Sequence, residues 1–158
     1  MHRLPMNYEQ FKERVVHIIT KMEAYNPYAV IAICMIVAHE SAGGQFWKQI
    51  GGGPALGIIQ MEGWVHEDTW RYCDSIQRRG KLLGFNKDIS KLASDLDYNI
   101  FMARCRLLMD SNPLPTTEKR MSEYLKEYWN SEGGKASTDD YLKDYIWWKN
   151  VDQTNNIF

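Results

Sequence analysis

The chain has 158 residues, of which 44% are hydrophobic and 13% aromatic, and its formal net charge is −1 at pH 7. This composition excludes a disordered tail, and residues 1–158 are enough for a single domain with a sizeable core. The near-neutral charge excludes a nucleic-acid-binding protein that relies on neutralising phosphates.

The first half of the chain predicts two helices. Residues 7–24 carry apolar side chains at helical spacing, which predicts an amphipathic helix. Asn26 and Pro27 then have the residue types of an N-cap and a first helical turn. The most apolar stretch of the chain follows at residues 28–38 and predicts a helix buried on all sides, which Gly43-Gly44 ends.

The middle of the chain is less regular. Residues 45–63 are too glycine-rich for a helix and predict a short β-hairpin or an irregular loop. A short helix is expected to start near Val65. The segment 80–90, with two glycines and an asparagine, is predicted to be mostly loop.

Three helices are predicted in the second half. A long helix covers about 91–110 and is stopped by the asparagine and prolines that follow. Thr117 is expected to cap the next helix, which ends at the sequence Asn-Ser-Glu-Gly-Gly of residues 130–134. A last helix is expected at 138–149. The fold class is therefore α+β and mostly α, with a buried central helix and a small hairpin or loop lobe.

No targeting, membrane or disulfide signal is found. The N-terminal sequence MHRLPMNYEQ has no apolar core of a secretory signal peptide, and residues 28–38 are shorter than the roughly 20 residues of a membrane span. Cys34, Cys73 and Cys105 are odd in number and lack the spacing of a disulfide framework or zinc site. Cys34 and Cys105 fall in apolar helical patterns and are predicted to lie in the core.

Glu40 closes the buried helix and is the main candidate for chemistry. Burial beside apolar side chains disfavours the charged form of a carboxyl group and raises its pKa. Such a group can stay protonated near neutral pH and donate a proton. A zinc-protease motif at His39-Glu40 would need a second histidine four residues after the first, where Gly43 stands, so no metal site and no cofactor are expected.

Three motifs follow one another in an order that resembles a known enzyme family. They are Glu40-Ser41 after the buried helix, Gly57-Ile-Ile-Gln60, and the sequence Tyr-Trp-Asn-Ser-Glu-Gly-Gly at 128–134. This order resembles the lytic transglycosylase (SLT) branch of the lysozyme superfamily, related to goose-type lysozymes, over about residues 26–135. A second likeness, to small phage-encoded transglycosylase-like proteins, is carried by His-Glu-Ser and by the sequence Gly-Gly-Gly-Pro-Ala-Leu-Gly at 51–57.

The resemblance implies roles for the residues of the first two motifs. Glu40 would be the general acid and then the general base. Ser41 would help to position the substrate or Glu40. Gln60 would face the sugar near the acid from the wall of a hairpin.

The third motif departs from the family pattern. Asn130 and an aromatic residue, either Tyr128 or Trp129, would line the floor of the cleft. The family has Tyr-Asn where this chain has Trp129-Asn130, and the glycine comes two residues later than usual. The role of the family tyrosine therefore stays open between Tyr128 and Trp129.

The choice between a lyase and a hydrolase depends on a second carboxylate. A lytic transglycosylase needs one carboxylate, because the C6 hydroxyl of the substrate attacks and leaves a 1,6-anhydro end. A lysozyme usually needs a second, for which Glu62 and Asp68 are the candidates. In a strand Glu62 would share a face with Gln60, which would bring it to the substrate-binding residues.

The function expected from the resemblance is an enzyme, a lytic transglycosylase that cleaves the MurNAc-β-1,4-GlcNAc bond of peptidoglycan. The alternatives are a lysozyme hydrolysing the same bond, and a non-catalytic structural or glycan-binding module of a virion. The expected partners are peptidoglycan glycan strands and other phage virion proteins, with no nucleic acid and no membrane. The expected location is the virion, or synthesis in the host cytoplasm followed by action on the periplasmic wall.

Overall fold

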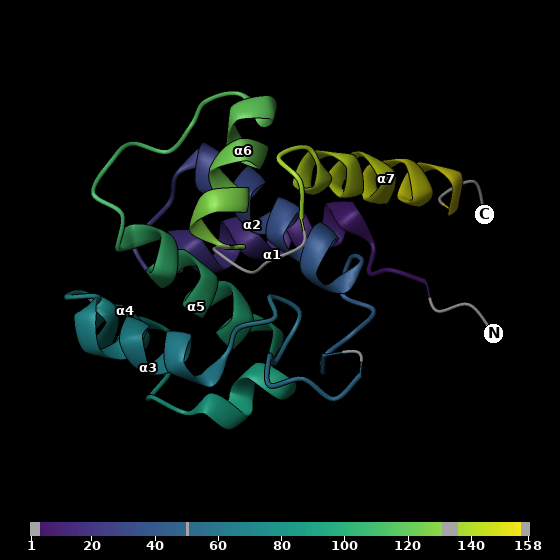
Figure 1. The fold of residues 1–158 in the computed structure, drawn as a ribbon. Coiled ribbons are helices and arrows are strands. Elements are labelled where there is room, and N and C mark those ends of the chain that lie inside the picture. The colour runs from purple at the N-terminus through teal and green to yellow at the C-terminus, as the bar shows by residue number, and fades with distance from the viewer. Residues whose placement is uncertain (1–3, 50, 131–135, 156–158) are drawn as a thin grey trace.

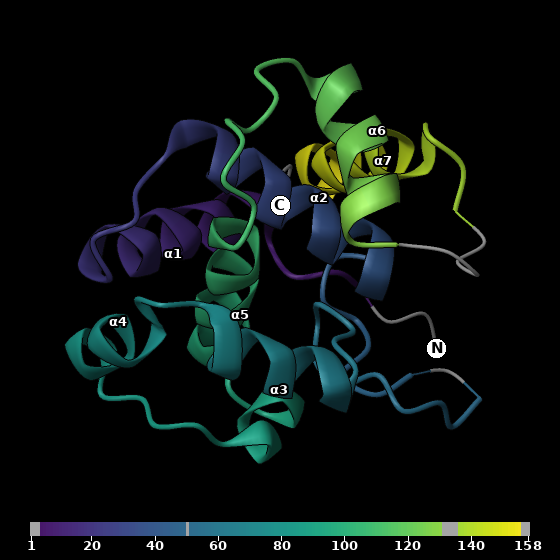
Figure 2. The same cartoon turned by 60° about the vertical axis from the view of Figure 1, so that its left-hand side comes forward.

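The computed structural model describes residues 4–49, 51–130 and 136–155, and most of these residues are helical. Figure 1 shows α6 and α7 on one side of α5 and α3 and α4 on the other, and Figure 2 shows the same order after rotation. The helical segments are α1 (Tyr8–Lys21), α2 (Pro27–Ser41), α3 (Gly63–Tyr72), α4 (Ile76–Leu83), the 3₁₀ helix η1 (Ile89–Ala93), α5 (Leu96–Leu108), α6 (Glu118–Tyr128) and α7 (Asp140–Asn155).

Helix α2 is the centre of the core and packs against α1, α5, α6 and α7. Every residue from Ala32 to Ala38 is buried, so the helix has no solvent-facing side there, as the apolar run at 28–38 predicts. Asn26 caps its start, because the side chain accepts hydrogen bonds from the backbone N–H groups of Tyr28 and Ala29. The predicted cap and first-turn proline are therefore confirmed.

The end of α2 is fixed by close packing. Ala42 takes a left-handed conformation with φ of 50°, and Gly43 follows with φ of 73°. A Cβ atom on Gly43 would lie 2.7 Å from Pro5 Cβ and 2.9 Å from Trp148 Nε1, so only glycine fits. The predicted stop is thus confirmed, and α7 and the N-terminal segment are held against the end of α2.

The glycine-rich segment after α2 has less β structure than the hairpin expectation implies. Only two isolated antiparallel bridges occur in its described part, Lys48 with Leu56 and Leu56 with Met61. Gly57 has φ of 81°, and a Cβ atom there would lie 2.1 Å from the Oδ1 atom of Asn99. The segment is a compact turn pressed against α5, in agreement with the loop alternative.

One loop prediction and one helix prediction in the middle of the chain are wrong in their bounds. Residues 80–83 belong to α4, because Gly80 lets this helix approach the chain that follows: a Cβ atom on Gly80 would lie 2.8 Å from the Phe85 carbonyl oxygen. The helix predicted at 91–110 starts only at Leu96, because Asp95 caps it by accepting a hydrogen bond from the Tyr98 N–H.

The last two helices form where they are expected. Thr117 caps α6, and its side chain accepts a hydrogen bond from the Arg120 N–H. Helix α7 is longer than the predicted 138–149 and buries Tyr141, Tyr145 and Trp148. Cys34 and Cys105 are fully buried, as predicted. In the described ranges no helix has both the length and the apolar character needed to cross a membrane.

Candidate functional site

Glu40 lies in the last turn of α2, where the helix leaves the core, and its side chain is partly buried. Burial raises the pKa of this carboxyl group to about 7, while the charge of His39 and a hydrogen bond from Tyr141 oppose the rise. Glu40 can therefore hold a proton near neutral pH, which is the ionisation behaviour that a general acid needs.

A short chain of polar contacts connects Glu40 to the C-terminal end of α6. The Tyr141 hydroxyl on α7 donates to Glu40 Oε2 over 3.4 Å, and a side-chain hydrogen bond joins Tyr141 to Asn130. Three residues that lie far apart in the sequence thus meet around one carboxyl group. Asn130 reaches Glu40 through Tyr141, not directly.

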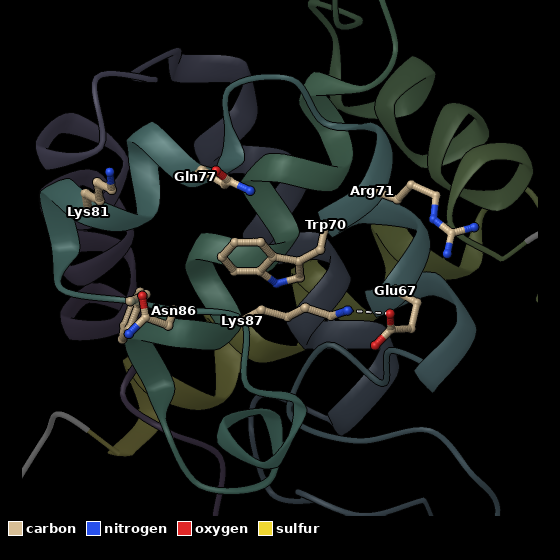
Figure 3. Close-up of a pocket in the computed structure, with 8 residues that line it drawn as sticks. Glu67, Trp70, Arg71, Gln77, Lys81, Asn86 and Lys87 are labelled. Carbon is tan, nitrogen blue, oxygen red and sulfur yellow. Dashed lines mark hydrogen bonds and ion pairs between the residues drawn. The ribbon is translucent and has the colours of Figure 1, made fainter.

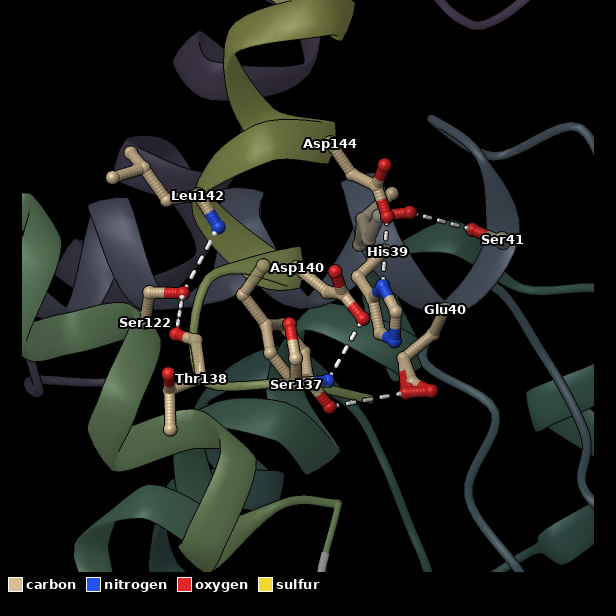
Figure 4. A network of polar contacts seen from close by, with 11 residues as sticks. His39, Glu40, Ser41, Ser122, Ser137, Thr138, Asp140, Leu142 and Asp144 are labelled. Atoms are coloured by element: carbon tan, nitrogen blue, oxygen red, sulfur yellow. Dashed lines mark hydrogen bonds and ion pairs between the residues drawn. The ribbon is translucent and has the colours of Figure 1, made fainter. Parts of the chain in front are cut away.

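His39 and Asp144 form the second contact between α2 and α7 at this site. His39 Nδ1 lies 2.7 Å from Asp144 Oδ2, and the imidazole ring packs on Tyr141 with 4.4 Å between the ring centroids. Burial opposes the ionisation of His39, but the hydrogen bond to Asp144 leaves its pKa raised. Figure 4 shows the imidazole between Asp144 and the Glu40 side chain.

The start of α7 is fixed by α6 and by its own first turn. Ser122 on α6 donates to the Thr138 carbonyl oxygen over 2.7 Å and accepts from the Leu142 N–H over 3.1 Å (Figure 4). Asp140 accepts a hydrogen bond from the Ser137 N–H. These contacts fix the turn of helix that carries Tyr141 and Asp144 toward Glu40.

Ser41 is fully buried, and its hydroxyl is used within the end of α2. It donates to the Val37 carbonyl oxygen over 3.0 Å and accepts from the Gly44 N–H over 3.1 Å. Of the two roles that the resemblance implies, positioning Glu40 fits this arrangement. A direct contact with substrate does not, because the hydroxyl is enclosed.

The second and third motifs contact each other through Trp129. Its indole N–H donates to the Ile59 carbonyl oxygen over 3.2 Å, so the end of α6 rests on the glycine-rich turn. Gln60, in that turn, donates its own side-chain N–H to the Gly57 carbonyl oxygen over 2.8 Å. No hydrogen bond between Gln60 and Glu40 occurs among the described residues. Residues 131–134 of the third motif lie outside the described residues.

The strand argument that placed Glu62 beside Gln60 is wrong. Gln60 has φ of 48°, a left-handed turn conformation, and Glu62 is the exposed residue at which α3 begins. Glu62 accepts a hydrogen bond from the Trp64 indole N–H over 2.7 Å. Asp68 pairs with Arg106 of α5 over 2.9 Å. Neither carboxylate has a described contact with Glu40 or the residues bonded to it.

Tyr128 has its described side-chain contacts with α5 and α6. Its hydroxyl donates to the Arg106 carbonyl oxygen, and its ring stacks on Tyr124 with 5.2 Å between the centroids. The tyrosine that contacts Glu40 is Tyr141, which the sequence indicates only as one of the apolar positions of the last helix. Asp144 is the other member that the motif pattern misses, since its pairing with His39, a residue of the His-Glu-Ser motif, is a tertiary contact.

Comparison with known proteins assigns the chain to no family. No family model, no curated protein and no solved structure matches the chain. Among the described residues, no group of three or more histidine, cysteine, aspartate or glutamate side chains is placed to hold a metal ion.

The raised pKa of Glu40 predicts a pH-dependent cost to stability. Because the folded-state pKa of about 7 exceeds the usual 4.5, ionised Glu40 destabilises the fold. The cost is absent below pH 4.5, grows as the pH rises toward 7 and is complete above it. Glu40→Gln is expected to be more stable than the wild type at pH 8 by roughly 1–3 kcal/mol, and equal to it near pH 4.

Chemical denaturation of both proteins across this pH range measures the difference directly. Groups that titrate alike in the two proteins cancel, so the change with pH reports Glu40. A stability difference that stays constant from pH 4 to pH 8 would show that Glu40 ionises without cost in the folded protein.

Proposed function

We propose that this chain is a peptidoglycan lytic transglycosylase with a lysozyme-like fold, and that Glu40 is its catalytic acid and base. One observation carries the proposal: a partly buried glutamate with a pKa of about 7 lies in the last turn of the central helix and is hydrogen-bonded to Tyr141, which is hydrogen-bonded to Asn130. This supports the roles that the motif order implies for Glu40 and Asn130. The hydrogen bond from Trp129 to the Ile59 carbonyl oxygen of the glycine-rich turn supports the proximity of the second and third motifs.

The proposed reaction uses one carboxyl group twice. Protonated Glu40 gives its proton to the glycosidic oxygen as the bond from C1 breaks, and positive charge develops at C1 of the MurNAc ring. The Glu40 carboxylate then removes the proton of the C6 hydroxyl of the same ring, whose oxygen bonds to C1. The products are a 1,6-anhydro end and a free 4-hydroxyl on the GlcNAc side, and Glu40 is protonated again.

Two placements favour the lyase over the hydrolase. A hydrolase usually needs a second carboxylate to activate water or to stabilise the cation. Asp68 forms an ion pair with Arg106. Glu62 lies exposed at the start of α3 and accepts a hydrogen bond from Trp64. Asp144 is the carboxylate whose charge acts on Glu40, and it is paired with His39. The same proposal takes the glycan strands of peptidoglycan as the substrate and a phage virion as the place where the protein acts.

Replacing the acid should remove activity but not the fold. Glu40→Gln is expected to lose about 10²–10⁴-fold of the rate at which suspensions of bacterial walls lose turbidity, the range for a lost general acid. Glu13→Gln, which changes an exposed glutamate of α1, is the matched control and should keep full activity. Wild-type rates in a folded Glu40→Gln protein would exclude Glu40 as the acid, and an inactive wild type would favour the non-catalytic module.

The products distinguish lyase from hydrolase. Mass spectrometry of digested peptidoglycan is expected to show anhydro-muropeptides, which are lighter by one water than the hydrolytic products. Reducing ends alone would contradict the one-carboxylate mechanism and would point to water activated near Glu40, where Asp144 is the nearest candidate.

His39 should set the upper pH limit of the activity. The positive charge of His39 lowers the pKa of Glu40. The hydrogen bond from Tyr141 also lowers this pKa, and the charge of Asp144 raises it. His39→Gln removes the cation, so the basic limb of the pH–rate profile is expected to move upward, by a few tenths to about one unit. His17→Gln, on the exposed face of α1, is the control. An unmoved or lowered limb in His39→Gln would contradict this coupling.

A further inference from the structure

A pocket lies beside α3 and α4, and it shares no lining residue with the group around Glu40. Its volume is about 430 Å³, within the range of small-molecule sites. The residues that line it are Glu67, Trp70, Arg71, Gln77, Lys81, Phe85, Asn86 and Lys87. Figure 3 shows the Trp70 indole in the middle of this pocket, with the other labelled side chains around it.

Trp70 is held in place from within the protein. Its indole N–H donates to the Tyr98 hydroxyl over 3.0 Å, and its ring contacts Phe101 at 5.9 Å between centroids. The glycine at position 80 brings α4 close, so that a Cβ atom there would lie 3.6 Å from the Trp70 ring. Because these contacts fix the indole, it forms a rigid aromatic surface that loses little conformational freedom when a ligand binds.

Four of the polar side chains around Trp70 have no hydrogen-bonding or ion-pair partner among the described residues. Arg71, Gln77, Lys81 and Asn86 form no hydrogen bond or ion pair with any described residue. Elsewhere in the described chain Arg14, Arg78 and Arg106 are each paired with a carboxylate. The pocket therefore offers two amides and two cations that are free to contact a ligand.

The charge of the pocket is positive. Lys87 pairs with Glu67 over 2.5 Å, so that pair is neutral overall. Arg71, whose charge also acts on Glu67, and Lys81 leave the lining with three cations against one carboxylate. A ligand that fits would present a flat apolar face to the indole, several hydroxyl or amide groups to Gln77 and Asn86, and one anionic group to the cations.

We propose that this pocket binds an acidic saccharide, a sugar unit that carries a carboxylate, stacked on Trp70. A pyranose ring has the apolar face, the hydroxyl groups and the size that the pocket accepts, and a carboxylate is the partner that arginine and lysine bind with charge-assisted hydrogen bonds. A nucleic acid fits less well, because the chain has a net charge of −1. The site uses none of the proposed catalytic residues.

The test is an NMR titration of ¹⁵N-labelled Glu40→Gln protein, which cannot cleave a glycan by the proposed mechanism. The probe is the disaccharide GlcNAc-MurNAc, whose lactyl group carries a free carboxylate, and the comparison is uncharged di-N-acetylchitobiose. Binding at this pocket is read from the Trp70 indole and from the side-chain amides of Gln77 and Asn86. Binding near Glu40 is read separately, from the side-chain signals of Trp129 and Asn130. The two proposed sites are therefore tested independently.

The acidic disaccharide is expected to shift the pocket signals, and the uncharged one to bind at least about fivefold more weakly there. The double variant Arg71→Gln/Lys81→Gln should weaken binding of the acidic disaccharide about tenfold, the usual size for lost charged hydrogen bonds. The matched control is Lys119→Gln/Arg120→Gln, two exposed cations that line another surface pocket, on α6. It should leave the affinity unchanged.

Three results would overturn the proposal. They are pocket signals that do not move at millimolar acidic disaccharide, equal affinity for the two disaccharides, and an affinity that the double variant at Arg71 and Lys81 leaves intact. Tighter binding of a short oligothymidylate than of the acidic disaccharide would replace it with a nucleic-acid site.

Discussion

The burial of α2 on all sides is the constraint on which the rest of the structure depends. Four helices pack around it, so the chain must emerge from the core where α2 ends, and Glu40 lies at that point. A carboxyl group in this place is partly removed from water, which raises its pKa to about 7. The same packing that stabilises the fold therefore leaves a carboxyl group that can hold a proton near neutral pH.

Helix α7 completes the site from the far end of the sequence. It packs on α2 and carries Tyr141 and Asp144 to the two residues that end the buried helix, Glu40 and His39. Tyr141 orients the carboxyl group, and the His39–Asp144 pair places a titratable charge beside it. The glycine at position 43 makes this approach possible, because any side chain there would strike Trp148 of α7. The geometry around Glu40 and the packing of the helices thus depend on the same contacts.

The sequence predicts those features that local chemistry controls. Asn26 and Thr117 cap helices as predicted, because a side-chain oxygen before a helix satisfies free N–H groups wherever it occurs. Helix α2 is predictable because its apolar run has no polar face. Glu40 is identified as the candidate acid for the same reason, from its position where that run ends.

Features controlled by tertiary contacts could not be predicted. Gly80 reads as a helix breaker, yet it lies inside α4 because the packing against residue 85 requires a small residue. The turn conformation of Gln60 invalidates the period-two argument that grouped it with Glu62. Tyr141 is 101 residues from Glu40, and nothing in the amphipathic pattern of its helix separates a core tyrosine from one bonded to an acid.

The pKa of Glu40 in the wild-type protein tests the central claim most directly. A ¹³C NMR titration of the side-chain carboxyl groups, with the Glu40 signal assigned by its absence in Glu40→Gln, gives this value without any assay of activity. A midpoint near 7 is expected, because burial at the end of α2 disfavours the carboxylate. A midpoint near the ordinary 4.5 would mean that Glu40 is ionised at neutral pH and cannot be the proton donor.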